Sequence, residues 1–230
     1  NISFKVYVPV KMATDLSTNG GSISLFNLSG SQNFSTSGGS LDIDKLSGHV
    51  KGRTSGGSIT VKNSKENIDL STSGGSIEAS NCEGSIKLGT SGGSLVLKSL
   101  KGNIRATTSG GSVDGNNIGG ELFASTSGGS VHFDDMACSL ETSTSGGNIH
   151  VTMKELGKYL TISNSSGNIE LNMPKNKGVD LKLKASKIRT ERFENFSGDV
   201  SDEEINGKLN GGGIPVKVKA GSGQISLALR

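Results

Sequence analysis

The segment Ser71-Thr72-Ser73-Gly74-Gly75-Ser76 decides the fold, because close copies of it recur along the chain at a fixed interval. An aliphatic residue lies three positions after the first glycine of each copy, as Ile59 and Ile77 do. Self-similarity at a fixed period is the signature of a solenoid, in which each repeat stacks on the next. The Gly-Gly pair begins at eight positions, each 18 residues after the last: Gly20, Gly38, Gly56, Gly74, Gly92, Gly110, Gly128 and Gly146.

Each repeat divides into two predicted strands. Apolar and polar residues alternate in Ile59-Thr60-Val61 and again nine residues later in Ile68-Asp69-Leu70. Such alternation is typical of strands that turn one face inward. The Gly-Gly pairs predict turns on one edge, and a second series that includes Gly84 and Gly102 predicts turns on the other. Glycine is suited to both because it permits a positive φ.

Eighteen residues would also suit a left-handed triangular helix of three hexapeptides. That fold requires aliphatic residues at even six-residue intervals, whereas here they fall at irregular offsets within the coil. Crossovers between parallel strands are overwhelmingly right-handed. We therefore expect an all-β fold, a single-stranded right-handed parallel β-helix with 18-residue coils.

The repeat loosens after Ile149, where two extra residues enter the coil, and both ends of the chain differ from the middle. Solenoids need atypical end units to cover the exposed core. We expect one domain over residues 1–230, with an N-terminal cap strand in 1–16, regular coils in 17–171, and degenerate coils and a cap in 172–230. The cap strand is predicted from apolar residues at alternate positions: Ile2, Phe4, Val6, Val8 and Val10.

Composition narrows the function classes. Only 31% of the residues are hydrophobic and 4% aromatic, which suits a narrow repetitive core of short aliphatic side chains. The net charge of +3 is scattered along the chain, so no nucleic-acid interface is predicted. No apolar run approaches the ~20 residues of a transmembrane helix. The chain begins with Asn1 rather than Met, and we expect a fragment or mature form from which a leader or anchor is missing.

The repeats and the closing segments resemble a known family. The tandem Thr-Ser-Gly-Gly-Ser-[Ile/Leu/Val] coils are similar to those of uncharacterised exported bacterial β-helix proteins to which an adhesin role is attributed. The segments 206–213 and 221–225 are similar to the C-terminal signature of that family. The resemblance covers nearly the whole chain. It implies a periplasmic or cell-surface role, and it brings no catalytic residues to this sequence.

A column of threonines lies one position before Ser-Gly-Gly, 18 residues apart, from Thr18 to Thr144. If this column were exposed, its hydroxyl groups would form a flat array like that of ice-binding β-helices. Thr72 follows the inward residues Ile68 and Leu70 at period two, so we expect the column to point inward and to bond to neighbouring turns. Calcium-binding nonapeptide rolls require a recurrent turn aspartate, which this repeat lacks, so no calcium or other cofactor is predicted.

Right-handed β-helices also include polysaccharide lyases and hydrolases, which require clustered carboxylates on one face. Asp42 and Glu78 share an outward column but are two coils apart, roughly 10 Å. Sugar-binding clefts often carry aromatic platforms, and this chain has no Trp and two Tyr. A pectin lyase or hydrolase is therefore the alternative prediction, not the first.

Asp114, His132 and His150 occupy consecutive coils of the same outward column and form the sharpest candidate cluster. Imidazole and carboxylate are natural metal ligands. A straight column spreads its members over about 10 Å, however, and zinc ligands must converge on one point. We expect no bound metal at this ladder. We likewise expect no disulfide, because Cys82 and Cys138 are about three coils apart.

The sequence therefore predicts a non-catalytic extracytoplasmic β-helix module that acts as a cell-surface adhesin or scaffold. The expected partners are a cell-surface glycan or a matrix protein, and no catalytic or cofactor-binding residue is assigned. A rigid, hydroxyl-rich rod is suited to display and to multivalent weak contacts, although a fold alone does not determine function.

Overall fold

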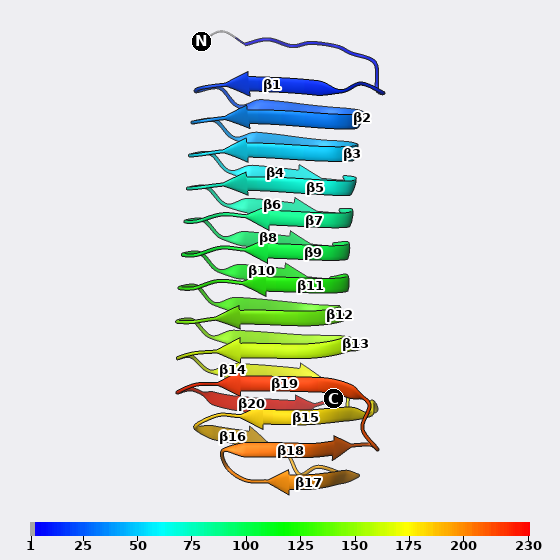
Figure 1. Cartoon of the computed structure of the whole chain (residues 1–230), viewed down its shortest axis with the longest axis vertical. Coiled ribbons are helices and arrows are strands. Elements are labelled where there is room, and N and C mark those ends of the chain that lie inside the picture. The colour runs from blue at the N-terminus through cyan, green and yellow to red at the C-terminus, as the bar shows by residue number, and fades with distance from the viewer. Residues whose placement is uncertain (1–2) are drawn as a thin grey trace.

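The computed structural model describes residues 3–230 and forms a parallel β-solenoid (Figure 1). As the chain descends from the N-terminus in Figure 1, β5, β7 and β9 run one way on the near side, and β4, β6 and β8 run the opposite way on the far side. This sense of winding is right-handed, as predicted. No helix occurs among residues 3–230, and hence none that could cross a membrane.

The strands follow the coils of the repeat. Those of the stack as far as Met173 are β1 (Thr14–Thr18), β2 (Ile23–Thr36), β3 (Leu41–Thr54), β4 (Ile59–Lys62), β5 (Lys65–Thr72), β6 (Ile77–Ser80), β7 (Glu83–Gly89), β8 (Leu95–Lys98), β9 (Lys101–Thr107), β10 (Val113–Asn116), β11 (Gly119–Ser125), β12 (Val131–Thr144), β13 (Ile149–Asn164) and β14 (Ile169–Met173). Those of the C-terminal part are β15 (Val179–Lys184), β16 (Lys187–Thr190), β17 (Phe196–Val200), β18 (Glu204–Leu209), β19 (Ile214–Ala220) and β20 (Gln224–Leu229).

The register confirms the 18-residue coil. Ile59 pairs with Leu41 on one side and with Ile77 on the other, and the same offset holds through the regular coils. The offset becomes 20 within the pairing of β12 with β13, where the two extra residues form irregularities before Leu140 meets Leu160, and it is still 20 where Ile149 meets Ile169. Inward aliphatic residues therefore stack in columns. Together they form a single hydrophobic core that extends from Ile23 to Leu227.

The two edges use glycine for different reasons. On one edge Gly30, Gly48, Gly84, Gly102 and Gly120 have positive φ, as predicted. The Gly-Gly pairs on the other edge lie in the turns between strands, as predicted, but without a positive φ. They are needed for space, because a Cβ atom on the second glycine of a pair would collide with the coil before it. At Gly75, for example, it would lie 2.1 Å from the carbonyl oxygen of Gly57.

A second column of left-handed residues was not predicted. It lies in the turn between the two strands of each coil, where asparagine tolerates the conformation better than most residues. Its members have φ between 51° and 57°: Asn27, Lys45, Asn63, Asn81, Ser99, Asn117 and Asp135. The asparagine amides add a side-chain ladder, in which Asn63 donates to Asp44 Oδ1 at 2.7 Å.

The C-terminal part does not continue the stack in chain order. After β14 the chain passes over one coil position, forms β15 and β16, and returns through β17 and β18. The last strands, β19 and β20, then fill the vacant position. β19 pairs with β13 and β15, and β20 pairs with β14 and β16 (Figure 1). The antiparallel strands β17 and β18 close this end of the solenoid.

The predicted cap strand in residues 1–16 is wrong for residues 3–13. Apart from an isolated bridge between Lys11 and Ser29, this segment makes no strand pairing, and the first strand begins at Thr14. Phe4 and Val6 are 88% and 77% exposed. Alternating apolar residues form a strand only where a neighbouring edge satisfies their backbone groups. Ile2 lies outside the described residues.

Candidate functional site

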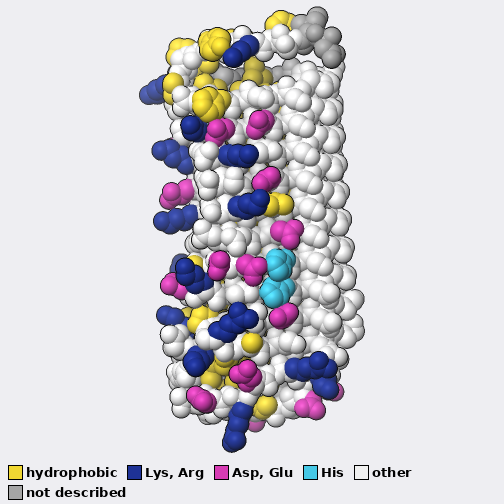
Figure 2. Space-filling view, turned by 180° about the vertical axis from the view of Figure 1, so that it is seen from behind, with side chains coloured by type: hydrophobic (Ala, Val, Ile, Leu, Met, Phe, Trp, Pro, Cys, Tyr) yellow, Lys and Arg dark blue, Asp and Glu magenta, His cyan; other side chains and the backbone are white. Residues whose placement is uncertain are grey.

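The candidate site is the outward column that the coils build on the far face of Figure 1. The register places Asp114 beside His132, and His132 beside His150. The inward neighbours of these residues, such as Val131 and Phe133, are buried in the core and fix the side chains outward. Figure 2 shows the two histidines in contact on this face, with acidic side chains around them.

The two imidazole rings stack with their centroids 4.8 Å apart and an angle of 20° between their planes. His132 Nε2 lies 2.8 Å from Asp134 Oδ2, and His150 Nδ1 lies 3.1 Å from Glu170 Oε2. Thr152 Oγ1 is 3.3 Å from His150 Nε2. Asp134 Oδ1 also lies 3.8 Å from His150 Nε2, so Asp134 contacts both rings and Glu170 contacts only the second, an arrangement that fixes the orientation of the two rings.

Sequence analysis missed both of these carboxylates. Asp134 lies two residues after His132, so the two side chains point to the same side of β12, and period-two alternation could have identified it. Glu170 follows His150 in the column only because the coil between them has 20 residues. Asp114 is the strand partner of His132, but within residues 3–230 it forms no ion pair or side-chain hydrogen bond with either histidine.

The cluster is more exposed than a buried catalytic centre would be. The side chains of His132 and Asp134 are 53% and 41% exposed, and that of Glu170 is 57% exposed. In the part of the chain that the structure describes, no three His, Cys, Asp or Glu side chains are arranged to hold a metal ion. The arrangement is that of a polar network on the surface of the stack. The expectation that no metal binds at this ladder stays a prediction.

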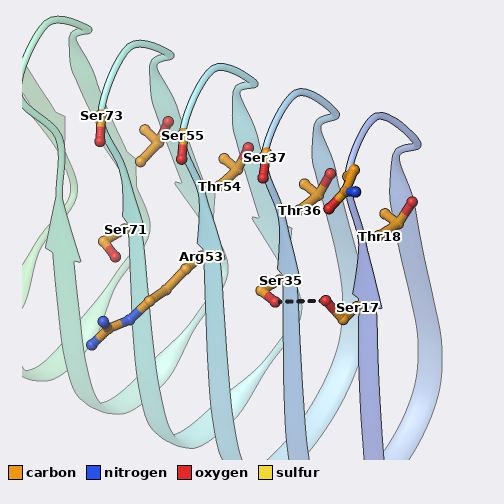
Figure 3. Close-up of a pocket in the computed structure, with 12 residues that line it drawn as sticks. Ser17, Thr18, Ser35, Thr36, Ser37, Arg53, Thr54, Ser55, Ser71 and Ser73 are labelled. Atoms are coloured by element: carbon orange, nitrogen blue, oxygen red, sulfur yellow. Dashed lines mark hydrogen bonds between the residues drawn. The ribbon is translucent and has the colours of Figure 1, made fainter.

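A second polar feature is a shallow groove of about 480 Å³ along the Gly-Gly edge of the first coils (Figure 3). Its walls are rows of hydroxyl groups, interrupted by Arg53. Ser35 Oγ donates to Ser17 Oγ at 3.4 Å. The lining residues are Ser17, Thr18, Asn19, Ser35, Thr36, Ser37, Arg53, Thr54, Ser55, Ser71, Thr72 and Ser73.

The threonines of this groove point inward, as predicted. Thr72 is 6% exposed, and its Oγ1 donates to the carbonyl oxygen of Gly57 at 2.8 Å. Thr72 Oγ1 also accepts from the N–H of Gly75 at 3.3 Å. This pair of bonds recurs from Thr36 to Thr144 and ties consecutive turns together. The buried ladder is confirmed, so these hydroxyl groups do not form the exposed array of an ice-binding surface.

The two acids considered for the enzyme alternative, Asp42 and Glu78, do not form one cluster. Asp42 and Glu78 are separated by Thr60 in the column, and Glu78 forms an ion pair with Lys98 at 3.1 Å.

The two cysteines, Cys82 and Cys138, are both free, as predicted, and both are buried. Burial raises the pKa of the Cys138 thiol to about 12, and it raises that of Cys82 as well, so neither is activated as a nucleophile.

The fold and these columns define the chain as a parallel β-solenoid whose polar side chains form ordered outer rows. A comparison with protein families identifies it further. The chain belongs to the Toastrack DUF4097 family, which it matches over residues 5–228. Searches of the curated proteins and of the solved structures found no match to this chain.

Proposed function

We propose that this protein is a non-catalytic, extracytoplasmic scaffold that makes adhesive contacts along its outer columns. The observation that carries the proposal is the continuous register of the stack. Because every regular coil pairs with the next at the same offset, each exposed position recurs at the strand spacing of about 4.8 Å. A stiff array of this kind supports many weak contacts at once, which together give high avidity.

The stiffness has a physical basis in the ladders. The threonine bonds join each Gly-Gly turn to the preceding one, and serine hydroxyls accept from the backbone in the same way, as Ser76 Oγ does from the N–H of Ser94 at 3.1 Å. These hydroxyl groups serve the structure. The groups free to bind a partner are those of the exposed columns, including the serine row of the groove and the histidine cluster.

Export to the periplasm or cell surface is part of the proposal. It is supported by the resemblance of the Thr-Ser-Gly-Gly-Ser coils to exported β-helix proteins. Fractionation of cells that produce the natural protein tests it, and recovery in the cytoplasmic fraction alone would refute it.

A binding screen tests the function. The chain is passed over immobilised glycans and matrix proteins, and a reducing-sugar assay on pectins runs in parallel. We expect binding to one class of surface and no release of reducing ends. Sustained release that His132→Ala or Glu170→Gln abolishes would instead favour the polysaccharide-active enzyme, the alternative that the histidine–carboxylate pairs support. The variant Lys62→Gln, outside the cluster, is the control.

A further inference from the structure

The net positive charge is not scattered evenly along the chain, as the composition alone indicated, but lies at one end. Residues 172–230 contain 11 of the 24 basic and 7 of the 21 acidic residues, a net charge of +4, whereas residues 1–171 carry 13 and 14, a net charge of −1. Two similar segments contribute to this excess, Leu181-Lys182-Leu183-Lys184 and Val216-Lys217-Val218-Lys219. They are far apart in the sequence, and the insertion of β19 beside β15 brings them together (Figure 1).

The pairing places the four lysines in a compact array. Lys182 is the direct partner of Lys217, and Lys184 is the direct partner of Lys219. The residues between them are buried in the core, so all four lysines point outward and are exposed. Neighbouring strands are about 4.8 Å apart and alternate residues about 6.6 Å apart along a strand. We call these four residues the lysine grid.

The grid has no ion-pair partner among the described residues. On the β13 side its strand partners are Thr161 and Ser163, and on the β18 side they are Asn206 and Glu204. Two acids are therefore near the four lysines: Glu204, the strand partner of Lys184, and Asp180, which precedes Lys182 by two residues on the same face of β15. The other strand partners are hydroxyl or amide side chains.

Elsewhere in the stack some lysines lie close to an acid, although Lys87 also has Arg105 as a direct strand partner. In the regular coils Lys87 faces Asp69 at 3.8 Å and Lys98 faces Glu78 at 3.1 Å. Like charges directly opposite on neighbouring strands destabilise a sheet, whereas opposite charges stabilise it. Two such pairs side by side lower the stability of this end. An anionic ligand would remove that repulsion.

We propose that the lysine grid binds an anionic glycan, a polysaccharide that carries sulfate, phosphate or carboxylate groups. Lysine ammonium groups bind such anions as point charges. The hydroxyl groups of Thr161 and Ser163 beside the grid can bond to sugar hydroxyls or anionic oxygens. A nucleic acid is a poorer fit, because no aromatic side chain lies among the strand partners of the grid to stack on a base. The inference rests on the proposed function and gives it a ligand class.

Binding of fluorescent dextran sulfate to the full chain, with neutral dextran of equal length as reference, tests the grid. In the quadruple variant K182Q/K184Q/K217Q/K219Q we expect affinity to fall at least about tenfold. The slope of log affinity against log salt should become less steep by about 3, close to one unit for each lysine contact. The matched control is K62Q/K65Q/K101Q/K154Q, which changes the net charge equally at exposed positions of the regular coils and should lose less than about threefold.

Thermal unfolding checks the fold of the variant. Since the substitutions remove repulsion between neighbours, we expect the grid variant to unfold at the same temperature as the parent or slightly higher. A marked fall would mean that the lysines are structural, and would overturn the proposal.

Three binding results would also overturn it. The first is an equal loss of affinity for dextran sulfate in the control variant. The second is tighter binding to single-stranded DNA than to dextran sulfate. The third is binding to vesicles of anionic lipid without binding to dextran sulfate. If the parent chain binds neutral glycans or matrix proteins but not dextran sulfate, the grid proposal fails and the adhesive function stands. If it binds none of these surfaces, both fail.

Discussion

The two ends of the solenoid cover the core in different ways. At the C-terminal end, β18 pairs with β15 and β17 pairs with β18, and Ile205 and Leu209 of β18 are buried. At the N-terminal end, β1 pairs with β2 alone, and the segment before it lies over the first coil without forming a strand (Figure 1). Seven of the eight exposed large hydrophobic side chains of residues 3–230 lie there: Phe4, Val6, Tyr7, Val10, Met12, Leu16 and Phe26.

The difference shows what closes a parallel stack. An antiparallel hairpin satisfies its own inner backbone groups and offers a short outer edge, which limits further pairing. A single extended segment has no second strand to hold it, so its apolar side chains stay exposed. The ends should therefore respond differently to equivalent substitutions, and the predictions below compare them.

The largest difference is expected from a charge in the core. Val216 of β19 is 0% exposed and lies between Leu160 and Leu181. Val216→Asp places an unpaired carboxylate among aliphatic side chains and should lower the free energy of unfolding by about 4 kcal/mol or more. Val6→Asp, at a position 77% exposed, should change it by less than about 0.5 kcal/mol. Urea unfolding followed by circular dichroism measures both, and equal effects would mean that the N-terminal segment is packed after all.

The Gly-Gly turns allow a second pair of substitutions to be compared. A Cβ atom at Gly39 would lie 2.1 Å from the carbonyl oxygen of Gly21 in the coil before it, so Gly39→Ala should cost about 2–3 kcal/mol. Gly21 belongs to the first turn of the stack, where a Cβ atom would meet only the side chain of Thr18, at 3.3 Å. Gly21→Ala should therefore cost well under about 1 kcal/mol. The same unfolding measurement distinguishes them, and similar losses would contradict the steric explanation.

The threonine ladder gives a smaller contrast. Thr90 Oγ1 donates to the carbonyl oxygen of Gly75 at 2.7 Å and accepts from the N–H of Gly93 at 3.2 Å. Thr90→Val leaves both backbone groups buried without this partner and should cost about 1–2 kcal/mol. Thr18, in the first turn, accepts a single exposed bond from Gly21 at 3.4 Å, so Thr18→Val should have little effect. Equal melting temperatures for the two variants would show that the threonine ladder does not stabilise the stack.

The smallest effect is spectroscopic and concerns the two tyrosines, Tyr7 in the N-terminal segment and Tyr159 in β13 of the stack. Tyr159 donates to Glu121 Oε1 at 2.6 Å, and this bond, with burial and the negative charge of Glu121, raises the pKa of Tyr159 to about 12. In a Tyr7→Phe background, absorbance at 295 nm follows Tyr159 alone. We expect a midpoint near 12, moving towards 10 in Glu121→Gln.

The sign of the accompanying stability change follows from the raised pKa. The contribution of the contact is fully present below the ordinary value of 10 and is lost as the pH rises towards 12. A midpoint that Glu121→Gln does not move would show that the hydrogen bond is absent in solution.

The middle of the molecule could be predicted residue by residue, and the ends could not. Ile59, Ile77 and Leu95 are partners because each coil repeats the last, so local pattern and long-range contact carry the same information. The position of β19 depends instead on pairing with β13 and β15, strands that do not share its repeat. The sequence predicted a strand at Ile214-Val216-Val218, but not its neighbours.

The candidate site was predicted in part because it lies in the repeating coils. The column of Asp114, His132 and His150 follows from the 18-residue period, and the structure stacks the two histidines as that period requires. Glu170 escaped prediction because the two-residue insertion shifts the column. Asp134 lies on the same face of β12 as His132 by period-two alternation, so its place in the cluster was open to prediction, although the 2.8 Å contact itself depends on the side-chain rotamers.

The placement of the last coil has a consequence for synthesis on the ribosome. Translation proceeds from the N-terminus, so the regular coils can stack as they emerge. That growth stops at Met173, because the next coil position is filled by residues 214–229, which are made later. Residues 175–210 must wait beside an unfilled gap until residues 214–229 have emerged. β19 and β20 then enter between the two coils, and the N–H of Lys175 donates to the carbonyl oxygen of Arg230 at 2.8 Å.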